Sequence, residues 1–179
     1  MKLVILLIVP TLFYGCGQDP EKTVEQPTAQ TQYGPPAKIT AYLQTIGPLI
    51  RTVSQTEMAV QKQVNASGKA TGENLSAAMQ EVLPSLQEAF YTFDKIEPPP
   101  LLAPLHKDIK KIFVLRLDAY NQTIKGWKLE QAKEESDLYV QAEAKMKEAN
   151  ILSQKLNQEM AKIQQALISQ TNTPSTTQQ

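Results

Sequence analysis

The chain has 179 residues with 18 basic and 18 acidic side chains, one histidine, one cysteine and few aromatic residues. A formal net charge of zero argues against nucleic-acid binding, which rewards a basic surface, and against electrostatic docking on anionic lipid. A single cysteine cannot form an internal disulfide, so any core has to be built from aliphatic side chains.

Residues 1–15 have the pattern of a secretory signal. Lys2 supplies a positive charge, and the apolar run over residues 3–12 is shorter than the roughly 20 residues that a membrane-spanning helix needs. Gly15 places a small residue directly before Cys16. The stretch resembles a bacterial lipoprotein signal peptide, in which the chain is cut before a cysteine that becomes acylated.

This resemblance implies that Cys16 carries a lipid anchor of palmitate-like chains. Each buried CH₂ contributes about 0.8 kcal/mol, so two or three chains hold a domain on a membrane. Gly17 follows the cysteine, which by resemblance implies the outer membrane in a diderm host and the outer face of the cell membrane in a monoderm host. Phe13 and Tyr14 depart from the usual lipoprotein pattern, so an ordinary cleaved signal and an uncleaved anchor stay open as alternatives.

Two segments have the composition of disordered chain. Residues 16–36 are rich in Pro, Gln, Thr and Glu and offer only Val24 and Tyr33 for burial, so we expect a flexible tether with a reach of roughly 25 Å. Residues 170–179 are similarly polar, and we expect a disordered tail. The sequence thus predicts a signal at 1–15, a lipidated tether at 16–36, a single helical domain at 37–169 and a tail at 170–179.

The first predicted helix follows an apolar stripe over residues 39–64, whose members are three, four or seven positions apart. Pro48 lacks a backbone donor and crowds the carbonyl four residues before it, so we expect a kink or a break there. A glycine-containing polar stretch at 65–74 ends the stripe, and Thr71 is a suitable N-cap for the next helix.

The second predicted helix follows an apolar stripe over residues 75–96. Pro84 lies within the stripe and should bend the helix. Prolines 98–100 should end it, because the residue before a proline is disfavoured in the α region.

Two longer stripes complete the helical domain. The third covers residues 102–127, with Pro104 suited to a first helical turn and Gly126 expected to loosen the far end. The fourth covers residues 138–167, with Ser136 as its expected N-cap and a length of about 32 residues, or near 48 Å.

No segment alternates with the period of a strand, and each of the four helices needs partners to bury its apolar stripe. Because the connections are short, the sequence predicts an all-α, up-down-up-down antiparallel four-helix bundle that is monomeric. The charged faces of the helices are expected to be solvated surface.

The corner between the second and third helices gives another resemblance. Many uncharacterised bacterial lipoproteins carry a Pro-Pro step, then Leu, then His about a turn later, at the start of a long helix. The matching residues here are Pro98, Pro99, Leu102, Leu105 and His106. The resemblance covers the signal and roughly residues 95–150, implies a helical lipoprotein of unknown activity and assigns no catalytic residue.

The residues themselves predict no enzyme, no metal site and no cofactor. His106 is the single histidine, so a triad, a di-metal bundle site or a bis-histidine haem cannot be assembled, and nucleotide-binding and nucleophile-elbow motifs are missing from the sequence. We expect His106 to lie at a helix start, partly exposed or hydrogen-bonded locally, and not to be essential for activity.

Two classes of function stay open. The first is a non-catalytic envelope module that presents a surface to an envelope protein, to peptidoglycan or to a host protein. The second is a bundle that binds an apolar molecule or a haem between helices kinked at Pro48 and Pro84. At the proline corner, Tyr91 and Leu101 are a candidate partner patch, with capping of the bundle end as the alternative role of its aromatic and leucine residues.

Overall fold

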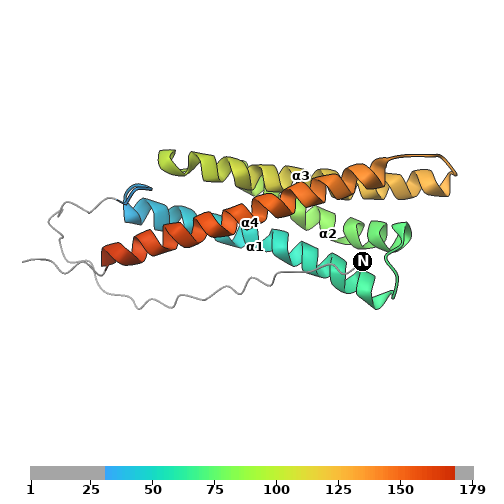
Figure 1. Cartoon of the computed structure of the whole chain (residues 1–179), viewed down its shortest axis with the longest axis horizontal. Helices are drawn as coiled ribbons and strands as arrows, with labels where there is room; N and C mark the ends of the chain where they lie inside the picture. Colours follow the sequence, from blue (N-terminus) through green and yellow to red (C-terminus); the bar gives the residue numbers. More distant parts are fainter. Residues whose placement is uncertain (1–30, 172–179) are drawn as a thin grey trace, which may run out of the picture.

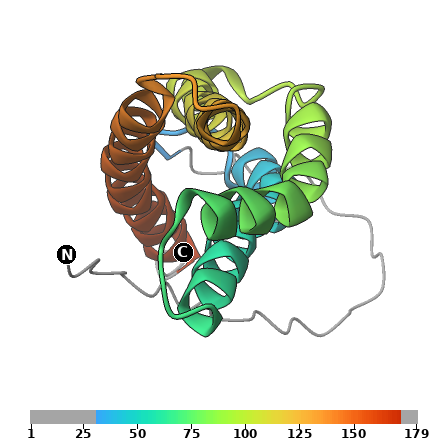
Figure 2. The ribbon, with the colours of Figure 1, turned by 90° about the vertical axis from the view of Figure 1, so that its right-hand side faces the viewer.

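The computed structural model describes residues 31–171, which are helical apart from turns and an isolated bridge between Thr31 and Gly34. The elements are α1 (Pro36–Ala66), α2 (Gly72–Phe93), the short 3₁₀ helix η1 (Pro100–Leu102), α3 (Ala103–Gln131) and α4 (Leu138–Thr171). Successive helices run in opposite directions (Figure 1) and are arranged in chain order around a common centre (Figure 2). The predicted all-α four-helix bundle is therefore confirmed over the described residues.

The predicted signal, Cys16 and most of the tether and tail lie outside the described residues. Residues 31–36, predicted as the end of the tether, are instead part of the folded domain. Thr31 is buried, and its hydroxyl donates to the carbonyl of Gly34 at 2.9 Å. Tyr33 packs against the core. Its burial helps to offset the entropy cost of ordering this polar segment, which was the reason for expecting a flexible tether.

Helix α1 has Pro35 as its N-cap, begins at Pro36 and contains a further proline. Pro36 occupies the first helical position, where the missing N–H costs no hydrogen bond. Pro48 lies inside the helix, so a break at this residue is wrong. Pro48 and Gln44 are both exposed, so the carbonyl that loses its donor can be hydrated instead.

Helix α2 starts as predicted and ends earlier than predicted. The Thr71 hydroxyl accepts from the backbone N–H of Asn74 at 3.2 Å, which confirms the N-cap. Pro84 is exposed within the helix. The helix ends at Phe93, before the three prolines, which lie in the connection and at the start of η1.

Helices α3 and α4 meet at a close turn. Pro104 lies in the first turn of α3, as predicted, but Gly126 does not loosen the helix, which continues to Gln131. Gly126 is buried, and a Cβ atom built there would lie 3.3 Å from the ring of Tyr139, so this glycine makes room for α4. Helix α4 begins at Leu138, and the N–H of Gln141 donates to the carbonyl of Asp137 at 3.0 Å, so the helix starts one residue later than a Ser136 N-cap would place it.

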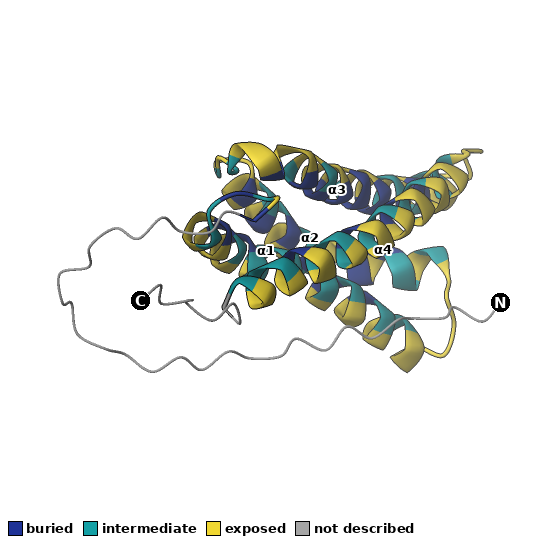
Figure 3. Ribbon diagram, turned by 60° about the vertical axis from the view of Figure 1, so that its left-hand side comes forward, coloured by how far each residue is buried: buried dark blue, intermediate teal, exposed yellow. Residues whose placement is uncertain are grey.

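The core lies between the inner faces of all four helices, while the outer faces are exposed (Figure 3). Aliphatic and aromatic side chains fill it, as the stripes predicted. Its fully buried members include Ile39, Ile46, Leu86, Phe93, Leu102, Phe113, Tyr120 and Ile163. Among the described helices, none is long and apolar enough to cross a membrane.

The α3–α4 pair has buried residues at every seventh position. On α3 they are Leu105, Ile112, Ala119 and Gly126, and on α4 they are Ala142, Ala149, Leu156 and Ile163. Polar pairs fix the antiparallel register: Lys155 with Asp108 at 2.8 Å, Lys145 with Asp118 at 3.1 Å and Gln122 with Gln141 at 3.1 Å.

This register places small buried residues near the α3–α4 turn and large ones at the other end. Small side chains allow two helices to approach closely, whereas leucine and isoleucine hold them apart. The ribbons are correspondingly close beside the turn and diverge toward the end of α4 (Figures 1 and 2). Backbone contacts between α1 and α4 are sparse compared with those between consecutive helices.

Candidate functional site

One arginine is buried where α1, α3 and α4 approach each other. The Arg116 side chain is only 2% exposed and forms an ion pair with Glu57 of α1 through Nη1. Its Nη2 donates to Asn150 Oδ1 at 3.2 Å and to Ser153 Oγ at 3.3 Å, both on α4. A single side chain therefore ties three helices together.

The surroundings of Arg116 explain its electrostatics. Burial lowers the pKa of Arg116 to about 10, and Tyr120 opposes this effect, so the guanidinium stays charged at neutral pH. Burial also raises the pKa of Tyr120. Among the described residues, Arg116 Nε has no hydrogen-bond partner. The arrangement can fix helix register, and its Glu57 carboxylate is partly exposed while the Arg116 guanidinium is buried.

The sequence prediction missed this cluster, although a signal existed. Arg116 and Thr123 follow Ile109 at seven-residue steps, and all three are buried on α3. A polar residue at a core-facing position of a helix is the signature of a buried polar contact. The apolar stripe skipped both positions because it was built from apolar residues alone.

His106 lies in the first turn of α3, and it bridges three helices. Its ring stacks on Phe93 with centroids 4.2 Å apart and planes 15° apart, and its Nδ1 lies 2.9 Å from the hydroxyl of Tyr42. Burial lowers the pKa of His106, Lys110 lowers it further, and Asp94 raises it in part. The expected helix-start position and partial exposure are confirmed, but the hydrogen-bond partner is distant in sequence and not local.

The structure gives the two residues of the predicted partner patch different neighbours. Tyr91 is 62% exposed and packs beside Phe90 with ring centroids 5.8 Å apart. Leu101 is 59% exposed and lies against Gly34. The adjacent Phe93 and Leu102 are buried, as the capping alternative requires.

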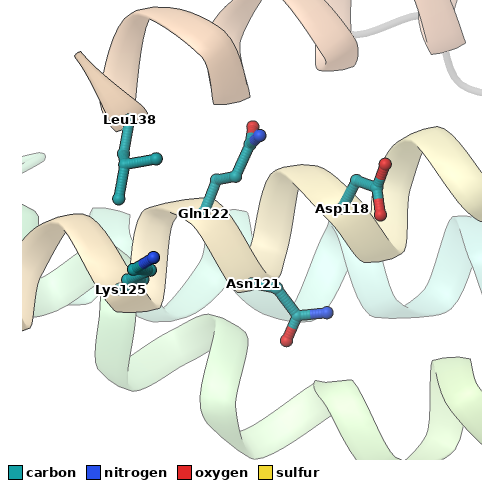
Figure 4. A pocket seen from close by; sticks show the side chains of 5 residues that line it. All are labelled: Asp118, Asn121, Gln122, Lys125 and Leu138. Carbon is teal, nitrogen blue, oxygen red and sulfur yellow. The ribbon is translucent and has the colours of Figure 1, made fainter.

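The clefts on the described surface include one beside the start of α4 and one beside η1. A cleft of about 290 Å³ between α3 and the start of α4 is lined by Asp118, Asn121, Gln122, Lys125 and Leu138. Gln122 points toward α4 and Asn121 points away from it (Figure 4). The groove is polar and open, and it holds no paired acid and base groups with a shared target.

The second cleft, of about 180 Å³, lies beside η1 and is called the end cleft below. Its lining residues are Tyr33, Leu101, Leu102, Pro104, Leu105, Asp108, Lys155, Glu159 and Ile163. Within residues 31–171 no group of three or more His, Cys, Asp or Glu side chains is placed to hold a metal ion.

The structure brings together His106, Tyr42 and Phe93, and separately Arg116 with its partners. Tyr91 is linked to the first group through the rings of Phe90 and Phe113. No protein-family model, no curated protein and no solved structure matches the chain.

Proposed function

We propose that this protein is a membrane-anchored envelope lipoprotein whose helical domain is a non-catalytic interaction or structural module. One observation supports the part of the proposal that concerns an interaction or structural module. The space between the four helices is occupied by the chain's own side chains, including Ile46, Leu86 and Phe113, which are almost completely buried. A partner therefore has to meet the outer surface.

The lipid anchor is supported by the sequence, through the signal-like residues 1–15 and the single cysteine that follows them. The arrangement of the bundle is consistent with attachment at one end. Helix α1 begins at the same end at which α4 finishes (Figure 1). Anchoring at Cys16 would place this end, called the tethered end below, toward the membrane and the α3–α4 turn away from it.

The anchor is tested by Cys16→Ser, compared with Thr28→Ser as a control in the same segment. We expect Cys16→Ser to abolish incorporation of labelled palmitate and to move the protein from the membrane fraction to the soluble fraction, because acyl chains supply the membrane affinity. The control should remain acylated and membrane-bound. A Cys16→Ser protein that stays in the membrane fraction at unchanged size would contradict the anchor.

The module is tested by site-specific photo-crosslinking in cells. A photoreactive residue replaces Tyr91 or Leu101 on the exposed surface, and Phe113 in the core serves as the control position. We expect crosslinked protein adducts from at least one exposed position and none from the core. A small molecule that co-purifies with the bundle in stoichiometric amount, seen by absorbance or mass spectrometry, would instead favour the ligand-binding alternative.

A further inference from the structure

The tethered end carries a short apolar surface of its own. Pro98 to Leu105 form an eight-residue run without a charged side chain, between Glu97 and His106. Leu102 and Leu105 are buried and fix the run to the core. The exposed members of the run are called the apolar tip: Pro100, Leu101, Ala103 and Pro104.

The apolar tip lies beside the place where the chain enters the bundle from its N-terminal side. Leu101 lies close to Gly34: a Cβ atom built on Gly34 would be 3.8 Å from the Cδ1 atom of Leu101. Tyr33, Leu101 and Pro104 line the same end cleft. Any force that draws the N-terminal segment toward a membrane therefore draws the apolar tip with it.

We propose that the apolar tip rests on the membrane surface to which Cys16 is attached; this inference rests on the proposed lipid anchor. Fourteen residues separate Cys16 from Thr31, and a segment of that length spans at most about 50 Å when fully extended. The tip is within that reach. The far end of α1 lies another ~45 Å away, because 31 helical residues rise 1.5 Å each.

The chemistry of the tip fits the boundary between lipid headgroups and acyl chains. The four tip residues carry no charge and gain by leaving water, whereas Asp108, Lys155 and Glu159, which line the adjoining end cleft, would keep their hydration among the headgroups. The prolines have little conformational freedom to lose on contact. The lipid anchor would keep the domain at a high local concentration near the membrane. A contact between tip and membrane that is too weak to hold a free domain there can then still be populated. Because the contact is apolar, it should be insensitive to salt.

The test uses the lipidated full-length chain in vesicles of phosphatidylethanolamine and phosphatidylglycerol. A nitroxide is attached at Leu101→Cys, with Val140→Cys as the matched control, since Val140 is 70% exposed in the first turn of α4. Lipidation occupies the Cys16 thiol, so the introduced cysteine is the single free one. Electron paramagnetic resonance then compares collisions with oxygen, which enters lipid, and with a water-soluble nickel chelate.

We expect the oxygen-to-nickel collision ratio at position 101 to rise severalfold on reconstitution, also at high salt, while position 140 stays water-like. Water-like values at both positions would overturn the proposal. Equal shielding of position 101 from both reagents without vesicles would also overturn it, because a second protein copy would then cover the tip.

A second variant removes the apolar contact and leaves the anchor. With the label moved to Ala103→Cys, an added Leu101→Glu should return the collision ratio to its water-like value, whereas an added Ala144→Glu on exposed α4 surface should not change it. Persistence of the membrane signal in the Leu101→Glu protein would contradict the inference. Failure of the anchor is distinguished separately, since Cys16 would then accept the label and the protein would not remain with the vesicles.

Discussion

At the scale of single residues, the ion pair between Arg116 and Glu57 is the most unusual feature of the bundle. Arg116 is almost fully buried, whereas the side chain of Glu57 is one-third exposed. Desolvation of a charged group costs several kcal/mol unless partners compensate for it. The desolvation cost therefore falls mainly on Arg116. Loss of the Glu57 carboxylate leaves the buried Arg116 guanidinium without its counter-ion.

We predict that Glu57→Gln lowers the free energy of unfolding by roughly 3 kcal/mol, because the Arg116 guanidinium loses its counter-charge in a buried position. Glu148→Gln removes an exposed ion pair with Lys111 and should change stability by less than about 0.5 kcal/mol. The double change Glu57→Gln with Arg116→Met should recover most of the loss. Urea denaturation of the three variants measures these differences, and equal effects of the two single changes would contradict the prediction.

His106 makes stability depend on pH. Its pKa in the folded protein lies below the ordinary value of 6.5, mainly through burial, so the unfolded chain binds a proton more readily. The contribution of neutral His106 is therefore complete above pH 6.5 and is lost as the pH falls through and below that value.

We predict that the free energy of unfolding decreases between about pH 7.5 and 5.5, and that His106→Gln has a flatter profile over this range. Denaturation curves at several pH values provide the measurement, with carboxylate titration dominating at lower pH in both proteins. Parallel profiles for the two proteins would show that His106 does not contribute.

At the scale of elements, the end of α3 has the hydrogen bonds of a Schellman motif. The N–H of Glu134 donates to the carbonyl of Leu129 at 2.9 Å, and that of Lys133 donates to Glu130 at 3.0 Å. Lys133 has a φ of 58°, in the left-handed region that costs a residue with a Cβ atom about 1 kcal/mol or more. The corresponding position after α1 is Gly68, with a φ of 74°.

We predict that Lys133→Gly stabilises the protein by about 0.5–1 kcal/mol, because relief of the left-handed strain exceeds the added entropy of the unfolded chain. Gly68→Ala should destabilise it by a similar amount, since no neighbouring atom hinders the new methyl and the backbone alone carries the cost. Thermal unfolding of both variants checks the pair, and shifts of the same sign would refute this account of the two helix ends.

The closeness of α3 and α4 near their turn depends on small buried residues. Ala149 is completely buried, whereas Ala144 on the same helix is exposed. We predict that Ala149→Leu destabilises the protein by about 1–3 kcal/mol by forcing the two helices apart, while Ala144→Leu changes stability by less than about 0.5 kcal/mol. Denaturant titration measures both, and a tolerated leucine at position 149 would mean that the helices separate without cost.

At the scale of the whole molecule, the seven-residue repeat on α4 is satisfied within one chain. Ala142, Ala149, Leu156 and Ile163 are all buried by the rest of the bundle. A heptad pattern of this kind serves a coiled-coil dimer equally well when no intramolecular partner is available. The antiparallel α3–α4 pairing supplies such a partner.

We therefore predict a monomer whose thermal midpoint does not change with protein concentration. Circular dichroism melts over a wide concentration range provide the measurement, together with sedimentation of the native protein. A midpoint that rises with concentration would indicate that folding is linked to association, and the buried face of α4 would then belong to an interface between chains.

Local rules in the sequence were sufficient for much of the fold. Helical spacing of apolar residues predicted all four helices, and Thr71 and Pro104 were correctly placed at helix starts because a cap and a first-turn proline act through adjacent backbone. Tyr91 and Leu101 remain a predicted partner patch, and the different neighbours that they have in the structure could not be predicted from helical spacing.

The remaining features were decided by tertiary contacts. Pro48 looked like a helix breaker, yet it lies on an exposed face where water can replace the lost hydrogen bond. Gly126 looked like a weak point, yet it is where α4 approaches α3. The hydrogen bond of His106 with Tyr42 joins residues 64 positions apart, so no local rule could find it.

The sequence by itself determined which segments are helical and which faces are apolar, because both depend on interactions within a few turns of one helix. The tertiary structure alone decided that Arg116 is buried, that small residues narrow one end of the α3–α4 pair, and that the apolar tip lies beside residues 31–34. These outcomes depend on which side chains face each other across distant segments, and burial energies and desolvation costs are set only when those segments meet.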